Sequence, residues 1–136
     1  MGTKIKRFVF DTNIVISSLV FQSAGAKRVR TLWLEGQLIP VVSKETTEEL
    51  IRVLAYPKFK LSALEQNILR DEYLLYAELC LDIRSFQSIY PCRDPWDQKF
   101  IDLALSSQVE GLMSGDQDIL IMKDVFPIPI YGLKSI

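Results

Sequence analysis

The sequence predicts a three-layer α/β domain, in which a small parallel sheet of about five strands is flanked by helices on both faces. Short apolar runs alternate with amphipathic stretches along the chain, a pattern typical of parallel strands joined by helical crossovers. The chain has 136 residues, of which 49% are hydrophobic, so it is large enough to bury a single core. Residues 1–136 are therefore expected to form one domain.

Five runs are predicted as strands and six stretches as helices, from the spacing of their apolar residues. The predicted strands comprise residues 7–10, 38–42, 81–83, 111–114 and 128–131. The predicted helices comprise residues 13–22, 26–35, 44–55, 61–79, 95–107 and 119–122. Because every strand except the last is followed by a helix, the strands are expected to run parallel.

Turn and capping residues set the expected ends of these elements. Gly36 is placed as the C-cap of the second helix, and Ser43 as the N-cap of the third. Pro40 lacks an amide donor, which favours a position near a sheet edge or a strand start. The segment Asp94–Asp97 predicts a helix start, with an N-cap aspartate followed by proline. The long helix 61–79 has expected core positions at Leu64, Ile68, Tyr73, Leu74, Leu75 and Leu79.

The composition narrows the chemistry available to the chain. Histidine is absent, which excludes serine triads, Cys-His pairs and zinc sites built on histidine. Cys80 and Cys92 lack a Cys-x-x-Cys spacing and are expected to be reduced packing residues. No apolar run approaches the ~20 residues of a membrane-spanning helix, and the N-terminus does not resemble a signal peptide. We therefore expect a cytoplasmic protein without membrane contact, whose chemistry depends on carboxylates, hydroxyls, lysine and bound metal.

Four acidic residues are the candidate functional residues, and each also has a purely structural interpretation. Asp11 and Asp116 each end a predicted strand and can cap the helix that follows. Asp97 fits the third position of a helix capping box, and Glu49 fits a solvated helix carboxylate. Glu49 lies at the rim of the apolar face of its helix, whereas Glu48 points further away from that face.

Taken together, the four acids indicate a metal site. In a parallel sheet with right-handed crossover connections, the ends of the strands and the starts of the helices lie at one edge of the sheet. Ligands bind at this edge in open α/β sheets. Two carboxylates ~5 Å apart at an effective dielectric of ~20 repel by roughly 3 kcal/mol, so such a cluster requires a cation or protons. Because the ligands would all be oxygen, the site would select Mg²⁺ or Mn²⁺ over zinc.

The sequence resembles the PIN-domain family over essentially its whole length. The matching pieces, in order, are Phe8–Asn13, Ser43–Phe59, Arg93–Ala104 and Met113–Leu120. No single piece is specific, but the ordered set is strong. The chain is most similar to the branch that contains toxins of toxin–antitoxin pairs, related to the Vap-type ribonucleases.

The resemblance implies a Mg²⁺- or Mn²⁺-dependent ribonuclease with a defined set of site residues. Its acidic cluster maps onto Asp11, Glu49, Asp97 and Asp116. The supporting positions are Asn13, Ser114, Asp94 and Asp118, of which Asp94 is expected to act mainly as a cap and Asp118 to reach the metal through water. The implied partners are an RNA substrate, a small antitoxin that covers the cleft, and a second copy in a homodimer.

Other interpretations remain open at this point. Lys27, Arg28 and Arg30 are candidates for contacts with the RNA backbone, although the net charge of −1 gives no sign of nucleic-acid affinity. A non-catalytic partner-binding module on the same fold would use the acids only as caps. An aspartate-based, Mg-dependent phosphatase would need a second aspartate where Asn13 stands, and an amide cannot transfer the proton.

Overall fold

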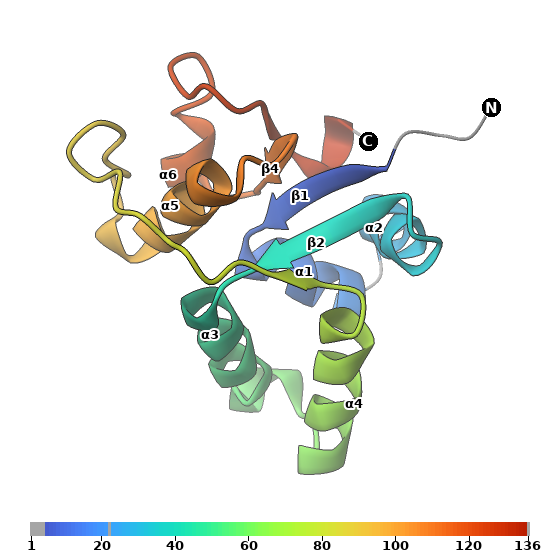
Figure 1. Cartoon of the computed structure of the whole chain (residues 1–136). Coiled ribbons are helices and arrows are strands. Elements are labelled where there is room, and N and C mark those ends of the chain that lie inside the picture. Colours follow the sequence, from blue (N-terminus) through green and yellow to red (C-terminus); the bar gives the residue numbers. More distant parts are fainter. Residues whose placement is uncertain (1–4, 22, 136) are drawn as a thin grey trace.

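A sheet of five parallel strands runs through the middle of the domain (Figure 1). The computed structural model describes residues 5–21 and 23–135. The strands are β1 (Lys6–Phe10), β2 (Leu38–Val42), β3 (Glu78–Leu79), β4 (Gly111–Met113) and β5 (Ile130–Tyr131). They lie in the order β3-β2-β1-β4-β5, which makes β1 the central strand.

Helices cover both faces of the sheet, which confirms the predicted fold class. They are α1 (Thr12–Ile16), α2 (Ala24–Leu34), α3 (Lys44–Leu54), α4 (Ala63–Leu74), α5 (Gln98–Ser107) and α6 (Gln117–Leu120). Helices α1–α4 pack into a core on one face, and α5 and α6 pack into a core on the other (Figure 1). No helix within the described ranges is long and apolar enough to cross a membrane.

The predicted first helix changes character along its length. It is α-helical only over α1 and continues as a π-helical turn over Ser17–Phe21. Its last predicted residue, Gln22, lies outside the described residues. Among the described residues there are also three 3-10 turns, and they comprise Pro57–Phe59, Pro95–Asp97 and Leu133–Ser135.

The central strands supply side chains to both cores. Phe8 and Phe10 of β1 pack under α1–α4, whereas Val9 packs under α5 and α6. Strand β4 follows the same alternation, with Met113 in the first core and Leu112 in the second. Successive side chains of a strand point to opposite faces, so a strand buried on both sides needs an unbroken apolar run. This requirement explains why these strands are recognisable in the sequence.

The predicted caps of α2 and α3 are confirmed. Gly36 follows α2 with a left-handed φ of +76°. The amide of Gln37 then donates to the carbonyl of Leu32 at 2.9 Å, as in a Schellman motif. At the start of α3, the Ser43 hydroxyl accepts from the Thr46 amide at 3.2 Å, and the Thr46 hydroxyl accepts from the Ser43 amide at 2.9 Å. This reciprocal capping box fixes the direction in which α3 leaves the sheet.

The prediction of a third strand at 81–83 and of a helix reaching residue 79 was wrong. Helix α4 ends at Leu74, and β3 forms upstream of the predicted strand, where it pairs with β2 from Val41 onward. The end of α4 is therefore set by a non-local strand pairing that apolar spacing does not encode. Pro40 lies just before this pairing, where β2 has an open side, as its missing donor requires.

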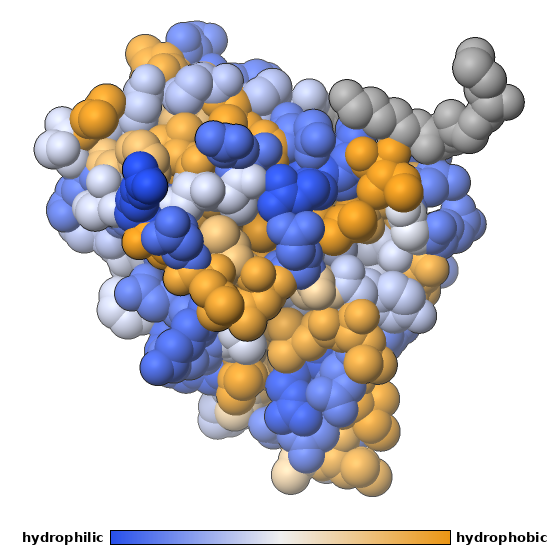
Figure 2. All heavy atoms as spheres, viewed as in Figure 1, coloured by the Kyte–Doolittle hydropathy of each residue, from blue (hydrophilic) through white to orange (hydrophobic). Residues whose placement is uncertain are grey.

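Most of the expected core positions of the long helix are exposed. Tyr73 is buried at 2% exposure and Leu74 is partly buried, so α4 faces the core with a different stripe from the one predicted. The remaining apolar positions lie on the surface, with exposures of 69% for Leu64, 56% for Ile68, 81% for Leu75 and 55% for Leu79. We refer to these four residues as the α4 apolar surface, and Figure 2 shows apolar side chains gathered over this part of the molecule.

Candidate active site

A cleft of about 230 Å³ opens beside the ends of β1 and β4. The residues that line it are Asp11, Thr12, Asn13, Glu49, Val53, Asp94, Trp96, Asp97, Phe100 and Asp116. The four acids singled out in the sequence are all among them, so the fold brings together carboxylates that are far apart along the chain. Among the predicted supporting residues, Asn13 and Asp94 also line the cleft, whereas Ser114 and Asp118 contact its acids or lie close to them.

Asp11 follows β1 directly and is 3% exposed. Its Oδ1 accepts from the amide of Ile14 at 2.9 Å and caps α1, and its Oδ2 accepts from the hydroxyl of Ser114. Burial raises the pKa of Asp11 to about 6 in spite of these two hydrogen bonds, and the nearby charge of Asp116 adds to the rise. The capping role therefore uses one oxygen and leaves a buried charge at the cleft.

Ser114 is fully buried and joins the ends of β1 and β4. Its hydroxyl donates to Asp11 and accepts from the amide of Asp116 at 2.9 Å. The amide of Asp11 donates to the carbonyl of Met113 at 3.0 Å, which holds the two strand ends side by side. Asp116 then caps α6 by accepting from the amide of Asp118 at 2.8 Å. One hydroxyl thus contacts two of the four acids.

Asp97 ends the 3-10 turn that leads into α5. The side chain of Asp94 caps this turn by accepting from the amide of Trp96 at 3.0 Å. Asp97 is 9% exposed, and its buried Oδ2 has no hydrogen-bond partner among the residues that the structure describes. Burial raises the pKa of Asp97 to about 7, together with the adjacent carboxyl of Asp116 and the charges of Asp94 and Asp11.

Glu49 differs from the other three acids because the protein itself supplies its counter-charge. It is 6% exposed, its Oε2 accepts from the Thr12 hydroxyl, and its Oε1 accepts from the Lys99 ammonium at 2.8 Å. Arg52 reaches to 3.9 Å from the same Oε1. Sequence reasoning missed these three partners. The i, i+3 spacing between Glu49 and Arg52 was a usable signal, whereas Lys99 is brought in from another helix by the fold.

A second group of acids overlaps the cleft. Carboxylate oxygens of Asp94, Asp97 and Asp118 lie within 4.8 Å of one another, a spacing at which one metal ion can bind all three. Asp118 also forms an ion pair with Arg93. Asp94 and Asp97 therefore both line the cleft and belong to this smaller cluster.

The donor set of the cleft fits a hard divalent cation. All the acidic ligands are oxygen, which suits Mg²⁺ or Mn²⁺. The unpartnered Oδ2 of Asp97 is the clearest sign, because a buried carboxylate oxygen without a donor is costly in an ordinary fold. Lys99 forms an ion pair with Glu49, whereas burial and the neighbouring carboxylates raise the pKa values of Asp11 and Asp97. A cation among these oxygens would relieve this imbalance.

The remaining predicted residues are not part of the acidic cluster. Asn13 is exposed at the cleft, and Lys27, Arg28 and Arg30 on α2 do not line it. Arg30 forms an ion pair with Glu72 of α4, so it contributes to packing between two helices.

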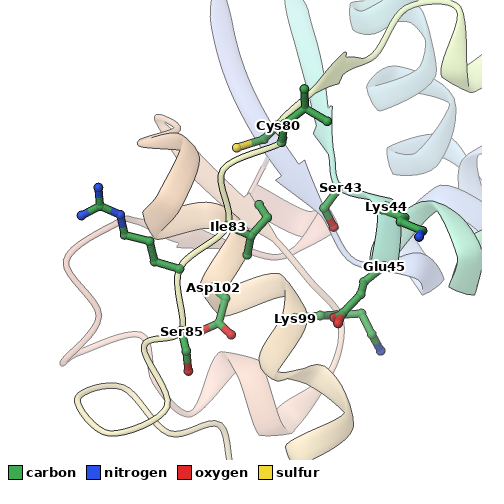
Figure 3. A pocket seen from close by; sticks show the side chains of 10 residues that line it. Ser43, Lys44, Glu45, Cys80, Ile83, Ser85, Lys99 and Asp102 are labelled. Carbon is green, nitrogen blue, oxygen red and sulfur yellow. The ribbon is translucent and has the colours of Figure 1, made fainter.

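A larger cleft of about 400 Å³ lies among the segment after β3, the start of α3 and α5. Figure 3 shows Lys99 and Asp102 of α5 near Ser43 and Glu45 of the α3 start, with Cys80 on the segment after β3. None of the four acids lines this cleft. The smaller, acidic cleft is therefore the candidate active site.

Comparisons with known proteins agree with this arrangement. The family model for the PIN domain matches residues 7–118. Among solved structures, a chain in the crystal structure of VapBC2 from Rickettsia felis bound to a DNA fragment from their promoter is similar, with a TM-score of 0.62 and 14% sequence identity. That match covers 93% of this chain and 98% of the other, and at this identity it is a likeness of fold. A comparison with curated proteins gave no match.

The family match begins in β1, four residues before Asp11, and extends into α6, which Asp116 caps. It spans far more than half of the chain and includes all four acids of the cleft. On this evidence of sequence and fold together, the chain belongs to the PIN-domain family.

Proposed function

We propose that this protein is a divalent-metal-dependent endoribonuclease and the toxin of a toxin–antitoxin pair. The observation that carries the proposal is the convergence of Asp11, Glu49, Asp97 and Asp116 on one cleft, with a buried carboxylate oxygen that has no donor among the described residues. Membership of the PIN-domain family supports a nuclease. The similarity of fold to a chain from the VapBC2 structure supports the toxin assignment.

The four acids would hold Mg²⁺ or Mn²⁺, and a bound ion of this kind lowers the pKa of a water molecule and offsets the charge of an attacked phosphodiester. The chain's own residues would keep the ligands in place. Ser114 orients Asp11 and the backbone of Asp116, and Thr12 and Lys99 fix the two oxygens of Glu49. Asp97 is held at the start of α5 by the capped turn before it.

Partners follow from the same proposal. The substrate would be RNA, and a small antitoxin would cover the cleft in the cytoplasm. The α4 apolar surface supports assembly with another chain, such as a second copy in a homodimer, because large exposed apolar areas mark interaction sites.

Two alternative functions fit the cleft less well. A non-catalytic partner-binding module would keep the acids only as caps, but Glu49 and the Oδ2 atom of Asp97 are buried without capping any helix. An aspartate-based phosphatase would need a proton donor two residues after Asp11, where Asn13 provides only an amide.

The test is RNA cleavage by purified protein with Mg²⁺ or Mn²⁺, comparing the wild type with Asp97→Asn. Removing this charge should lower the rate by more than the roughly 10–100-fold that outer partners of metal sites contribute. The matched control is Asp124→Asn, which makes the same chemical change at an exposed turn and should leave the rate unchanged. Undiminished cleavage by a folded Asp97→Asn protein would refute the proposed site.

A further inference from the structure

Trp96 is an aromatic residue left in water at the edge of the candidate active site. It is 61% exposed, although it lies between the proline that starts the 3-10 turn and the buried Asp97. It lines both the acidic cleft and a neighbouring cleft of about 350 Å³. The turn therefore places Asp97 among the acids and the preceding residue, Trp96, at the edge of both clefts.

Two cations gather at this indole ring. The Lys99 ammonium lies 4.3 Å from the ring centroid, and the Arg52 guanidinium carbon lies 5.2 Å from it. Both approach the same Oε1 of Glu49, at 2.8 Å for Lys99 and 3.9 Å for Arg52, so the indole ring, the two cations and this carboxylate form one cluster. The high exposure of the ring leaves indole surface open to a ligand.

The two cations differ in what they can still bind. Lys99 is 11% exposed and donates to Glu49 and to the carbonyl of Trp96 at 2.6 Å, so its charge is used within the protein. Arg52 is 47% exposed and reaches Glu49 only at 3.9 Å. Its guanidinium is therefore open to a phosphate next to the exposed indole.

We propose that Trp96 and Arg52 form a binding platform for single-stranded RNA, on which one base stacks on the indole while Arg52 contacts an adjacent phosphate. This inference rests on the proposed nuclease function and names the form of RNA that the site accepts. Every base has a π-face, so an exposed aromatic ring beside a cation binds single strands with little sequence preference. Bases in a duplex are already stacked on one another and do not reach the ring. The platform also explains how a chain of net charge −1 holds an anionic substrate beside four carboxylates.

The chain contains two tryptophans, which makes stacking directly observable. Trp33 is 1% exposed in the core and out of reach of a ligand, whereas Trp96 is open. A 12-nucleotide single-stranded RNA, mixed rapidly with the full-length wild type in Mg²⁺, should quench the fluorescence of Trp96 before cleavage proceeds. The same RNA in a perfect duplex should produce little quenching.

Trp96→Leu and Trp96→Phe separate stacking from simple packing over Lys99. Leucine keeps an apolar cover but has no aromatic face, so KM for the single strand should rise about five- to hundredfold with little change in kcat. Phenylalanine keeps a face for stacking and should retain most of the affinity. Arg52→Gln should raise KM and weaken its dependence on salt. Thermal unfolding of each variant verifies that the fold is intact.

Two outcomes would overturn the proposal of a binding platform. One is an unchanged KM for the single-stranded RNA in folded Trp96→Leu, and the other is equal quenching of the wild type by single-stranded and duplex RNA. Either would leave the nuclease proposal standing if metal-dependent cleavage is observed. Conversely, saturable quenching by the single strand without any metal-dependent cleavage would support the platform and refute the nuclease proposal. The two proposals thus fail in distinguishable ways.

Discussion

The acidic cleft buries charged side chains, whereas the surface of helix α4 exposes apolar ones, and both arrangements are the reverse of what a folded protein usually shows. At the cleft, Asp11 and Asp97 are buried carboxylates, whereas Leu64 of α4 and Leu75 directly after it are apolar side chains exposed to water. Burying a charge is costly unless a partner compensates it, and exposing several large apolar side chains is costly unless another surface covers them. Both regions therefore point to something outside the chain, a cation in one case and a protein in the other.

The contrast is sharpest at the C-terminal end of α4. Tyr73 packs edge-on against Trp33, with ring centroids 5.2 Å apart, whereas Leu75 is 81% exposed only two positions later. Tyr73→Ala should lower the free energy of unfolding by about 3–5 kcal/mol, because a large buried side chain is lost. Leu75→Ala should change it by less than about 0.5 kcal/mol. Urea unfolding of both variants measures the difference, and equal effects would contradict the placement of the buried stripe.

The sequence was sufficient to predict that acids meet at the cleft, but it was not sufficient to predict which side of α4 is buried. Asp11 and Asp116 were predictable as neighbours, because parallel strands end at one edge of a sheet. The burial of α4 was not predictable, because this helix carries apolar residues on more than one side and tertiary packing selects among them. The position of β3 depends on pairing with β2, and the Glu49–Lys99 contact joins two helices, so neither appears in local spacing.

Removing the cation should make the cleft sensitive to pH. The pKa values of Asp11 and Asp97 are raised to about 6 and about 7, so the folded protein retains protons that the unfolded chain has already lost between pH ~4 and ~7. In EDTA, the free energy of unfolding should therefore fall as pH rises through this window, by roughly 1.4 kcal/mol for each pKa unit by which the two carboxyl groups are raised. Asp97→Asn should flatten the decline. Stability that rises through this window in EDTA would show that the acids are compensated by the protein alone.

Adding the cation should have the opposite effect at neutral pH. Binding to the native state alone stabilises by about 2.7 kcal/mol at a metal concentration 100 times Kd. Millimolar Mn²⁺ or Mg²⁺ should raise the Tm of the wild type, and the rise should be much smaller in Asp97→Asn. Asp124→Asn serves again as the matched control, because its carboxylate lies on an exposed turn. Equal shifts in all three proteins would indicate unspecific binding.

Anomalous diffraction from a crystal soaked in Mn²⁺ tests most directly whether the cleft is a metal site. We expect a peak among the carboxylates of Asp11, Asp97 and Asp116, within about 2.2 Å of the nearest oxygens and close to the Oδ2 of Asp97 that lacks a donor. Absence of any peak in the cleft at saturating Mn²⁺, with the four acids in their present positions, would contradict the metal site and the nuclease function built on it.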